Sequence, residues 1–237
     1  MKAYSALAGS YEYLQRDYDY EKWSQYLIKH LTKLPNNKGV DVGSGTGIIT
    51  RALKDAGFDV CGTDVSVEML NTAIATSNGI PFYLQSADKF SGFKGIGFVT
   101  AVNDVVNYLT AKKAVEFFTR VYKALAPNGT FIFDVSTKYK LEKVLKNNTF
   151  TCEDEEVSYI WHNSLLNKKV RMELTVFTKN DDGTYTRSEE SHLQYVHTKD
   201  FIIKSLKNLG FVVEVYADFG KKPQQDSQRL HFICKKK

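Results

Sequence analysis

The stretch Val40-Asp41-Val42-Gly43-Ser44-Gly45-Thr46-Gly47 decides the fold, because it joins a short apolar run to a helical pattern through three alternating glycines. Without β-carbons at these positions, a tight strand-to-helix turn can bring its bare backbone against a ligand. Asp41 comes two residues before the first glycine, where its carboxylate would repel a nucleotide phosphate and attract an ammonium or sulfonium group. The stretch therefore predicts a ligand site that favours a cationic ligand.

The composition is that of an ordinary globular protein of 237 residues, of which 43% are hydrophobic and 25% charged. A chain of this length can form one large core, or one core plus a small subdomain. It has no run approaching the ~20 apolar residues of a membrane span, and residues 1–5 lack the apolar run of a secretory signal, so we expect a cytoplasmic protein without membrane contact.

The cysteines, histidines and net charge limit the partners. Neither the three cysteines nor the five histidines show metal-ligand spacing, so we expect no metal and reduced thiols. The net charge of +5 leaves nucleic acid open as a partner without requiring it.

From residue 38 onward, strand-like and helix-like segments alternate, which is typical of a parallel sheet with helices on both faces. Residues 4–34 carry apolar and aromatic residues at helical spacing and predict two helices. The further elements that we predict are a strand ending at Val42, strands at 59–64, 81–85, 97–102, 130–135, 211–216 and 230–234, and helices at 47–56, 66–77, 111–125 and 198–209.

Two more carboxylates follow predicted strands. Asp64 ends the second strand, nineteen residues after Gly45, and Asp88 follows the third. Because parallel strands bind ligands at their carboxyl ends, we expect both residues at the same edge of the sheet as Asp41. There, the carboxylate of Asp64 can accept hydrogen bonds from both hydroxyls of a ribose, and that of Asp88 can accept a hydrogen bond from an adenine amine.

This ordered set of acids and glycines resembles the cofactor half of the Rossmann-like S-adenosylmethionine-dependent methyltransferases over residues 38–135. The resemblance implies an α/β fold, with a Rossmann-like seven-stranded, mostly parallel sheet, and S-adenosyl-L-methionine as the cofactor. It implies that the glycine turn holds the methionine part, Asp64 the ribose and Asp88 the adenine. The cofactor-binding residues that it implies are Tyr11, Trp23, Asp41, Gly43, Ser44, Gly45, Gly47, Asp64, Val65, Met69, Ala87, Asp88 and Asn103.

The N-terminal segment resembles a small bacterial-type branch of this family, which opens with a Tyr-Asp pair and then an Asp-Tyr-x-x-Trp segment. Here the pair is Tyr11-Glu12, with Glu in place of Asp, and the segment runs from Asp19 to Trp23. The resemblance implies that Tyr11 and Trp23 cover the cofactor. Aromatic residues at helical spacing are also typical of a core, so both interpretations stay open. The likeness continues through residues 107–109 and 227–230.

Residues 151–197 break the alternation and predict antiparallel strands, with Asp181-Asp182-Gly183 as a hairpin turn. We expect this insert to form an antiparallel β lid over the carboxyl edge of the sheet, where the methyl acceptor would be selected. The predicted organisation is an α/β methyltransferase domain of residues 1–150 and 198–237, including a helical cover at 1–37, and an inserted substrate subdomain of residues 151–197.

Methyl transfer from a sulfonium is an in-line displacement, so the protein must mainly align the acceptor and exclude water. A general base is needed only when the acceptor carries a tightly held proton. The catalytic candidates are Tyr108, which follows the strand at 97–102, and His192 with Glu190 in the insert. His162 is a further candidate, although a surface imidazole is the commoner role for histidines in such strands.

Other functions fit these residues less well. A nicotinamide dehydrogenase requires Gly-x-Gly-x-x-Gly, but Ile48 stands at the position of the third glycine. Methyltransferases that act on exocyclic base amines carry prolines in the segment after the fourth strand, and residues 103–106 contain none. Those that act on cytosine carbon use a cysteine that follows a proline, and none of the three cysteines here does so. We therefore predict an enzyme that methylates a small-molecule acceptor, as a monomer or homodimer. An RNA methyltransferase acting on tRNA or rRNA, and a non-catalytic module that binds the cofactor, stay open as alternatives.

Overall fold

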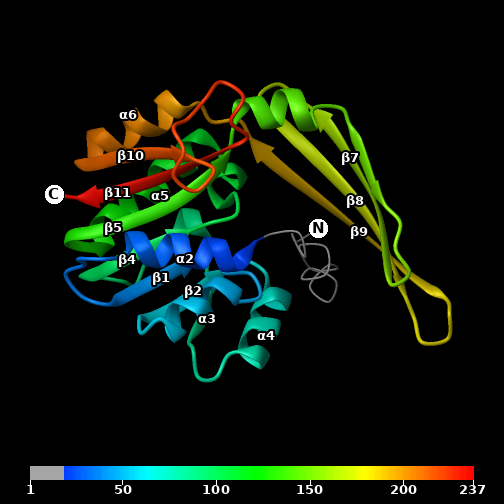
Figure 1. Ribbon diagram of the computed structural model, residues 1–237, viewed down its shortest axis with the longest axis horizontal. Helices are drawn as coiled ribbons and strands as arrows, with labels where there is room; N and C mark the ends of the chain where they lie inside the picture. The colour runs from blue at the N-terminus through cyan, green and yellow to red at the C-terminus, as the bar shows by residue number, and fades with distance from the viewer. Residues whose placement is uncertain (1–18) are drawn as a thin grey trace.

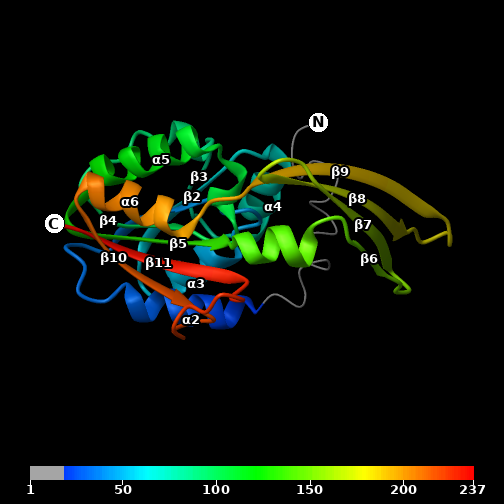
Figure 2. The ribbon, with the colours of Figure 1, turned by 90° about the horizontal axis from the view of Figure 1, so that it is seen from above.

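The computed structural model describes residues 19–237, which form a seven-stranded sheet flanked by helices and a separate four-stranded sheet (Figure 1). The smaller sheet extends away from the larger one at a single end of the molecule (Figure 2). Tyr11 and the first predicted helix lie outside the described residues.

The large sheet has the strand order β10-β11-β5-β4-β1-β2-β3. Strand β11 pairs antiparallel with both β10 and β5, and the remaining pairs are parallel. This arrangement confirms the predicted Rossmann-like fold with an antiparallel pair at one edge. The strands are β1 (Lys38–Val42), β2 (Asp59–Asp64), β3 (Phe82–Leu84), β4 (Ile96–Ala101), β5 (Leu125–Ser136), β10 (Phe211–Ala217) and β11 (Arg229–Lys236).

Helices cover both faces of the large sheet, with α5 and α6 on one side and α2 and α3 on the other (Figure 2). Two helices are capped at their N-termini: the hydroxyls of Ser66 and Thr198 accept hydrogen bonds from the amides of Met69 and Phe201. The helices are α2 (Tyr20–His30), α3 (Ile48–Asp55), α4 (Val67–Thr76), α5 (Ala111–Ala124) and α6 (Lys199–Leu209). Among residues 19–237, no helix is long and apolar enough to cross a membrane.

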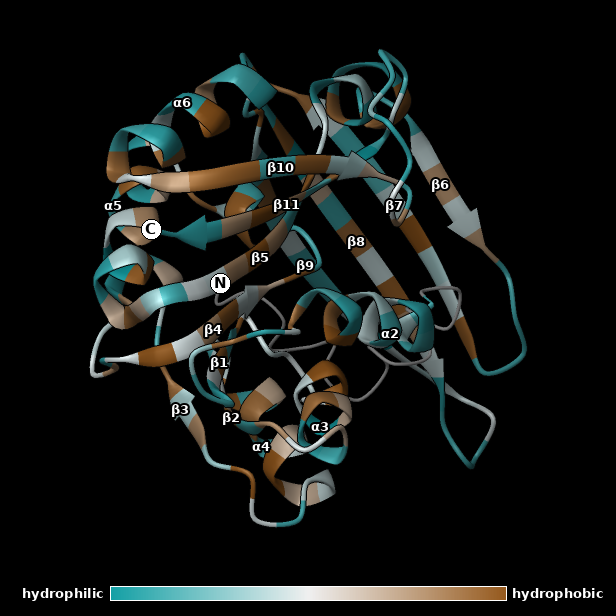
Figure 3. Cartoon of the chain, turned by 60° about the vertical axis from the view of Figure 1, so that its left-hand side comes forward, coloured by the Kyte–Doolittle hydropathy of each residue, from teal (hydrophilic) through white to brown (hydrophobic). Residues whose placement is uncertain are grey.

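The main core lies between the central strands and the α5–α6 layer, where Figure 3 shows hydrophobic colouring along the strands. Phe133 of β5 stacks on Phe232 of β11 with ring centroids 4.8 Å apart, and Phe117 of α5 meets Phe131 edge to face at 5.6 Å. This core buries all of β4 and most of β5, so the loops at their carboxyl ends begin from packed strands.

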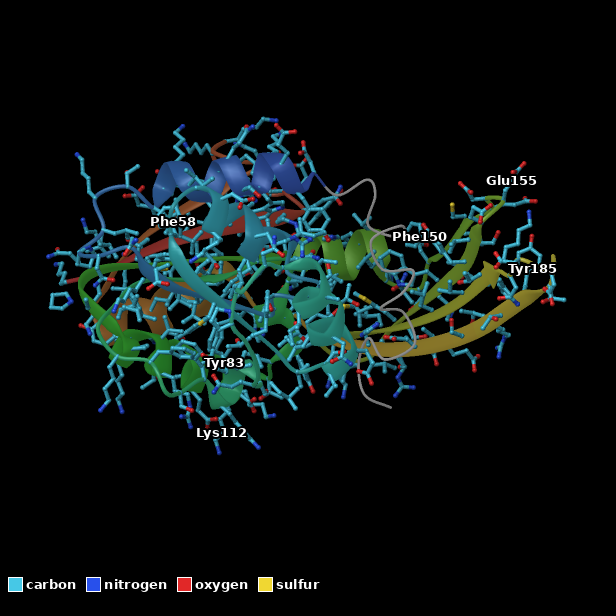
Figure 4. All side chains as sticks on the ribbon, turned by 90° about the horizontal axis from the view of Figure 1, so that it is seen from below. Phe58, Tyr83, Lys112, Phe150, Glu155 and Tyr185 are labelled. Carbon is cyan, nitrogen blue, oxygen red and sulfur yellow. The ribbon has the colours of Figure 1, made fainter. Side chains whose placement is uncertain are left out.

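The small sheet is an antiparallel meander of β6 (Thr149–Cys152), β7 (Val157–Leu165), β8 (Lys169–Lys179) and β9 (Tyr185–Tyr195). The predicted turn around Gly183 joins β8 to β9, and Gly183 has a φ of +79°. Glu155 and Tyr185 mark the free end of this sheet, far from the large sheet (Figure 4).

Three features differ from the predicted elements. Strand β5 begins at Leu125, earlier than the predicted strand at 130–135, because Asn128 adopts a φ of +63° and the register with β4 shifts there instead of breaking the strand. Strand β6 and the π-helical turn η3 (Lys140–Leu145) were not predicted. Leu141 and Leu145 of η3 pack on the small sheet, so the turn forms from tertiary packing that local spacing does not encode.

Candidate cofactor and acceptor site

The glycine turn between β1 and α3 requires the backbone freedom of glycine. Gly43, Gly45 and Gly47 have φ values of +70°, +53° and +83°. A β-carbon on Gly43 would lie 2.4 Å from Cγ2 of Val105, which belongs to the loop after β4. The turn is therefore packed directly against that loop, and glycine is needed both for its conformation and for its space.

Asp64 and Asp41 lie on either side of this turn. The carboxylate of Asp64 accepts hydrogen bonds from the amides of Gly45 and Ser66, each at 2.9 Å. The carboxylate of Asp41 is buried and accepts hydrogen bonds from the hydroxyls of Thr50 and Thr100, each at 2.7 Å. Burial raises the pKa of Asp41 to about 6, although the two hydroxyls oppose the shift.

Two neighbouring cavities open at the turn and share Gly43, Gly45 and Asn103. The larger has a volume of about 250 Å³ and the smaller about 40 Å³. The predicted residues in the lining of the larger cavity are Asp64, Val65, Met69, Ala87, Asp88 and Tyr108. Those in the lining of the smaller cavity are Asp41 and Ser44. Gly47 lines neither cavity and instead packs near the ring of Phe82.

Asp88 lies in the short helical turn η1 (Ala87–Lys89), which follows β3. Its carboxylate forms an ion pair with Nζ of Lys113 at 2.7 Å and accepts a hydrogen bond from the hydroxyl of Ser86. These two contacts lower the pKa of Asp88. Lys113 was not predicted, because only the packing of α5 on η1 brings the two side chains together.

Trp23 lies in a cluster of packed aromatic side chains. It is 2% exposed, stacks on His231 with ring centroids 4.7 Å apart, and meets Phe219 edge to face at 5.0 Å. It lines neither of the two cavities. These contacts favour the core interpretation of Trp23 over the cofactor-covering one, while the predicted role of Tyr11 lies outside the described residues.

The structure brings Tyr108 and His192 together from distant parts of the chain. Tyr108 belongs to the helical turn η2 (Val105–Tyr108), and its ring meets that of His192 edge to face with centroids 6.0 Å apart. Nε2 of His192 lies 3.0 Å from a carboxylate oxygen of Glu190, and both side chains are less than a tenth exposed. His162 is exposed and its Nδ1 bonds the hydroxyl of Thr149, which agrees with a surface role.

The two faces of the small sheet explain this difference between the histidines. Asn163, Met172 and His192 are cross-strand neighbours and all are buried, so we call this side the inner face. The adjacent row of His162, Glu173 and Ser191 is exposed. Within residues 19–237, no group of three or more His, Cys, Asp or Glu side chains is arranged to hold a metal ion.

A buried ionic cluster, which was not predicted from the sequence, supports the loop after β4. Arg229 of β11 contacts both Asp104 and Asp134, and Asp134 in turn binds the amide of Asn103. Its signals in the sequence are an acid in the strand at 130–135 and an arginine within the segment at 227–230 that resembles the family.

The residues present fit an adenosine ligand with a cationic tail. The glycine turn leaves backbone open to a ligand, Asp64 and Asp88 face the larger cavity, and Asp41 borders the smaller one. This fold and this set of acids define a methyltransferase of the Rossmann-like class. When bound, S-adenosylmethionine supplies an electrophilic methyl group, and these residues would hold its adenosine and methionine parts.

Comparisons with known proteins agree with this class. Residues 40–129 match the family described as a methyltransferase domain. A protein of Geobacillus sp. (strain WCH70) that is classed among the methyltransferases is 35% identical over 98% of this chain and 99% of its own length. A S-adenosylmethionine-dependent methyltransferase from Clostridium acetobutylicum has a crystal structure with a TM-score of 0.89, 26% identity and 96% coverage of both chains.

A further solved structure shares the fold. It is that of CalS10, an amino pentose methyltransferase from Micromonospora echinaspora with bound S-adenosylmethionine, at a TM-score of 0.77 and 16% identity, covering 95% of this chain and 94% of that one. The chain belongs to the S-adenosylmethionine-dependent methyltransferases, and S-adenosylmethionine is its cofactor.

Proposed function

We propose that this enzyme transfers a methyl group from S-adenosylmethionine to a small-molecule acceptor held between the larger cavity and the inner face of the small sheet. The observation that carries the proposal is the contact between Tyr108, which lines the cavity, and His192, which lies on the inner face. A group bound beside both rings would be close to the cofactor and largely shielded from water.

The pair formed by His192 and Glu190 supports a role in proton transfer. A carboxylate beside an imidazole orients the ring, so the pair can take a proton from a hydroxyl or ammonium acceptor. Tyr108 can hydrogen-bond the same acceptor through its phenol group. We therefore assign the general base to His192 and a binding role to Tyr108.

A small acceptor is consistent with one structural relative. CalS10 is an amino pentose methyltransferase, but at 16% identity it shares the fold alone and does not identify the acceptor of this enzyme. Four further points remain predictions: the cofactor-binding residues, the inserted subdomain at 151–197, the cytoplasmic location and a monomeric or homodimeric state.

The proposal is tested by incubating the enzyme with S-adenosylmethionine labelled at the methyl group, together with either a metabolite extract or total RNA. We expect label in the small-molecule fraction, with loss of that label in Asp64→Ala and His192→Asn variants. Label in tRNA or rRNA alone would replace the proposal with RNA methylation. Calorimetric binding of the cofactor with no transfer to either fraction would support a non-catalytic binding module.

A further inference from the structure

The loop after β4 holds an unusual backbone conformation at the point where it lines the cofactor cavities. Asn103 and Asp104 are consecutive and have φ values of +64° and +67°. Residues with side chains rarely adopt this left-handed conformation, so two in a row require support from the surrounding structure. Asn103 lines both cavities, and the loop residue Val105 packs on Gly43.

Asp134 of β5 supplies this support. Its carboxylate oxygens accept hydrogen bonds from the amide of Asn103 at 2.6 Å and from the amide of Asp104 at 3.4 Å. Asp134 is fully buried, so these contacts are shielded from water. One side chain therefore binds both amides of the left-handed pair.

Arg229 of β11 connects the two carboxylates. Its guanidinium donates to Oδ1 and Oδ2 of Asp104 at 2.9 and 3.2 Å, and it also donates to Asp134. The hydroxyl of Ser136 donates to Oδ1 of Asp104 at 2.8 Å. A buried carboxylate is stable only when it is paired and hydrogen-bonded, and Arg229 meets that need for both acids at once.

The same contacts continue into the small sheet through Asn107, which is fully buried. Its side-chain oxygen accepts from the amide of Ser136 at 2.9 Å, and its side-chain nitrogen donates to the carbonyl of Ser136 at 3.2 Å. That nitrogen also donates to the carbonyl of Tyr195 at 3.1 Å. Tyr195 ends β9, the strand that carries His192, so Asn107 joins the large sheet to the acceptor side.

We propose that Asp134, Arg229, Asp104, Ser136 and Asn107 form a positioning relay, which fixes the loop beneath the methyl donor relative to strand β9. Asp134 and Arg229 set the cofactor side, and Asn107 sets the acceptor side. The acceptor half rests on the proposed function, whereas the cofactor half stands without it. None of these side chains needs to touch the acceptor, and each acts through the residues that it holds.

The cofactor half is tested with Asp134→Asn, which keeps the shape of the side chain and removes the charge that faces Arg229. We expect S-adenosylhomocysteine to bind about tenfold more weakly by calorimetry, because the amide group cannot accept from both backbone amides and from Arg229. Hydrogen exchange at the amides of Asn103 and Asp104 should become about tenfold faster in the ligand-free protein.

Thr130→Val is the matched control, since Thr130 is a buried polar residue in the middle of β5, outside the cluster around Asp134. It should leave both the affinity and the exchange at residues 103–104 unchanged. Arg229→Met should reproduce Asp134→Asn, and Arg229→Lys should recover part of the affinity because it retains the charge. Wild-type affinity and exchange in both Asp134→Asn and Arg229→Met would overturn the cofactor half.

If Asp134→Asn does not fold, Ser136→Ala decides the same question, since it removes a single hydroxyl donor to Asp104. We then expect about threefold faster exchange at residues 103–104, and unchanged exchange would overturn the proposal.

The acceptor half is tested with Asn107→Ala. We expect the turnover number to fall about tenfold in the label-transfer assay, while the affinity for S-adenosylhomocysteine stays within about twofold of wild type. An equal loss of both, or of neither, would overturn this half. If the wild-type enzyme transfers no methyl group, the proposed function fails, but the affinity and exchange of Asp134→Asn still decide the cofactor half.

Discussion

The carboxyl edge of the large sheet and the inner face of the small sheet satisfy their buried acids differently. At the sheet edge, Asp64 is held by backbone amides and Asp41 by two threonine hydroxyls. On the small sheet, the buried Glu190 lies against the imidazole of His192. The partners of Asp64 are backbone amides that the fold itself provides, and those of Asp41 are threonines of α3 and β4. By contrast, Glu190 and His192 are side chains on one strand that could change without altering it. We therefore expect cofactor binding to depend on the fold itself and acceptor choice to depend on exchangeable side chains.

Among the variants that test this difference between the two regions, we expect the largest loss of cofactor binding at Gly43. Gly43→Ala introduces an unfavourable φ and an overlap with Val105, so we expect no detectable binding of S-adenosylhomocysteine and a loss of about 3 kcal/mol in the free energy of unfolding. Gly57→Ala is the control, since Gly57 has a φ of +92° but open space around it, and should cost only about 1 kcal/mol. Calorimetry and urea unfolding measure both, and equal behaviour of the two variants would contradict the packing argument.

The next effect concerns the two histidines on opposite faces of the small sheet. His192→Asn should lower the turnover number about a hundredfold, the contribution expected of a general base, with little change in cofactor affinity. His162→Asn should leave the turnover number unchanged, because His162 is exposed on the other face. The label-transfer assay measures both variants, and similar losses would show that the sheet has no functional inner face.

The pH dependence of stability offers a smaller effect at the sheet edge. Burial raises the pKa of Asp41 from 3.8 to about 6, so between these pH values the folded protein binds a proton that the unfolded chain has lost. The free energy of unfolding should therefore fall as the pH rises through this window, by up to about 1.4 kcal/mol per pH unit from this group. Asp134 contributes with the same sign, since burial raises its pKa to about 6 as well.

Asp41→Asn should flatten that pH dependence without abolishing it, because Asp134 remains. Urea unfolding of wild type and Asp41→Asn between pH 4 and 7 measures the difference. The same pH slope in both proteins would mean that Asp41 is not protonated in the folded state within this window.

The smallest effect is expected where the sheet edge meets solvent, at the ion pair between Lys113 and Asp88. Lys113→Met should weaken cofactor binding about threefold, since a half-exposed ion pair contributes little and Ser86 still holds the carboxylate. Lys112→Met is the control, because Lys112 points away from the protein (Figure 4). Calorimetry decides, and tighter binding in Lys113→Met would mean that Lys113 competes with the ligand for Asp88.

The difference between backbone-held and side-chain-held groups also explains which features could be predicted from the sequence. The glycine turn, the place of Asp64 at a strand end and the alternation of strands with helices follow from local spacing, whereas the order of the strands in the sheet does not. The residues Lys113, Asp134 and Arg229 could not be assigned, since their roles arise from contacts between α5, β5 and β11 that local patterns do not encode. Trp23 shows the converse, because its aromatic spacing agrees equally with a core and with a ligand cover, and its described contacts favour the core.

We expect the carboxyl edge of the large sheet to hold the cofactor independently of the small sheet. The most direct test is calorimetric titration of S-adenosylhomocysteine into wild type, Asp64→Ala, the control Asp59→Ala at the exposed start of the same strand, and His192→Asn. We predict at least about tenfold weaker binding for Asp64→Ala alone, with the other variants within about twofold of wild type. Wild-type affinity in Asp64→Ala, or a loss in His192→Asn as large as that in Asp64→Ala, would contradict the account.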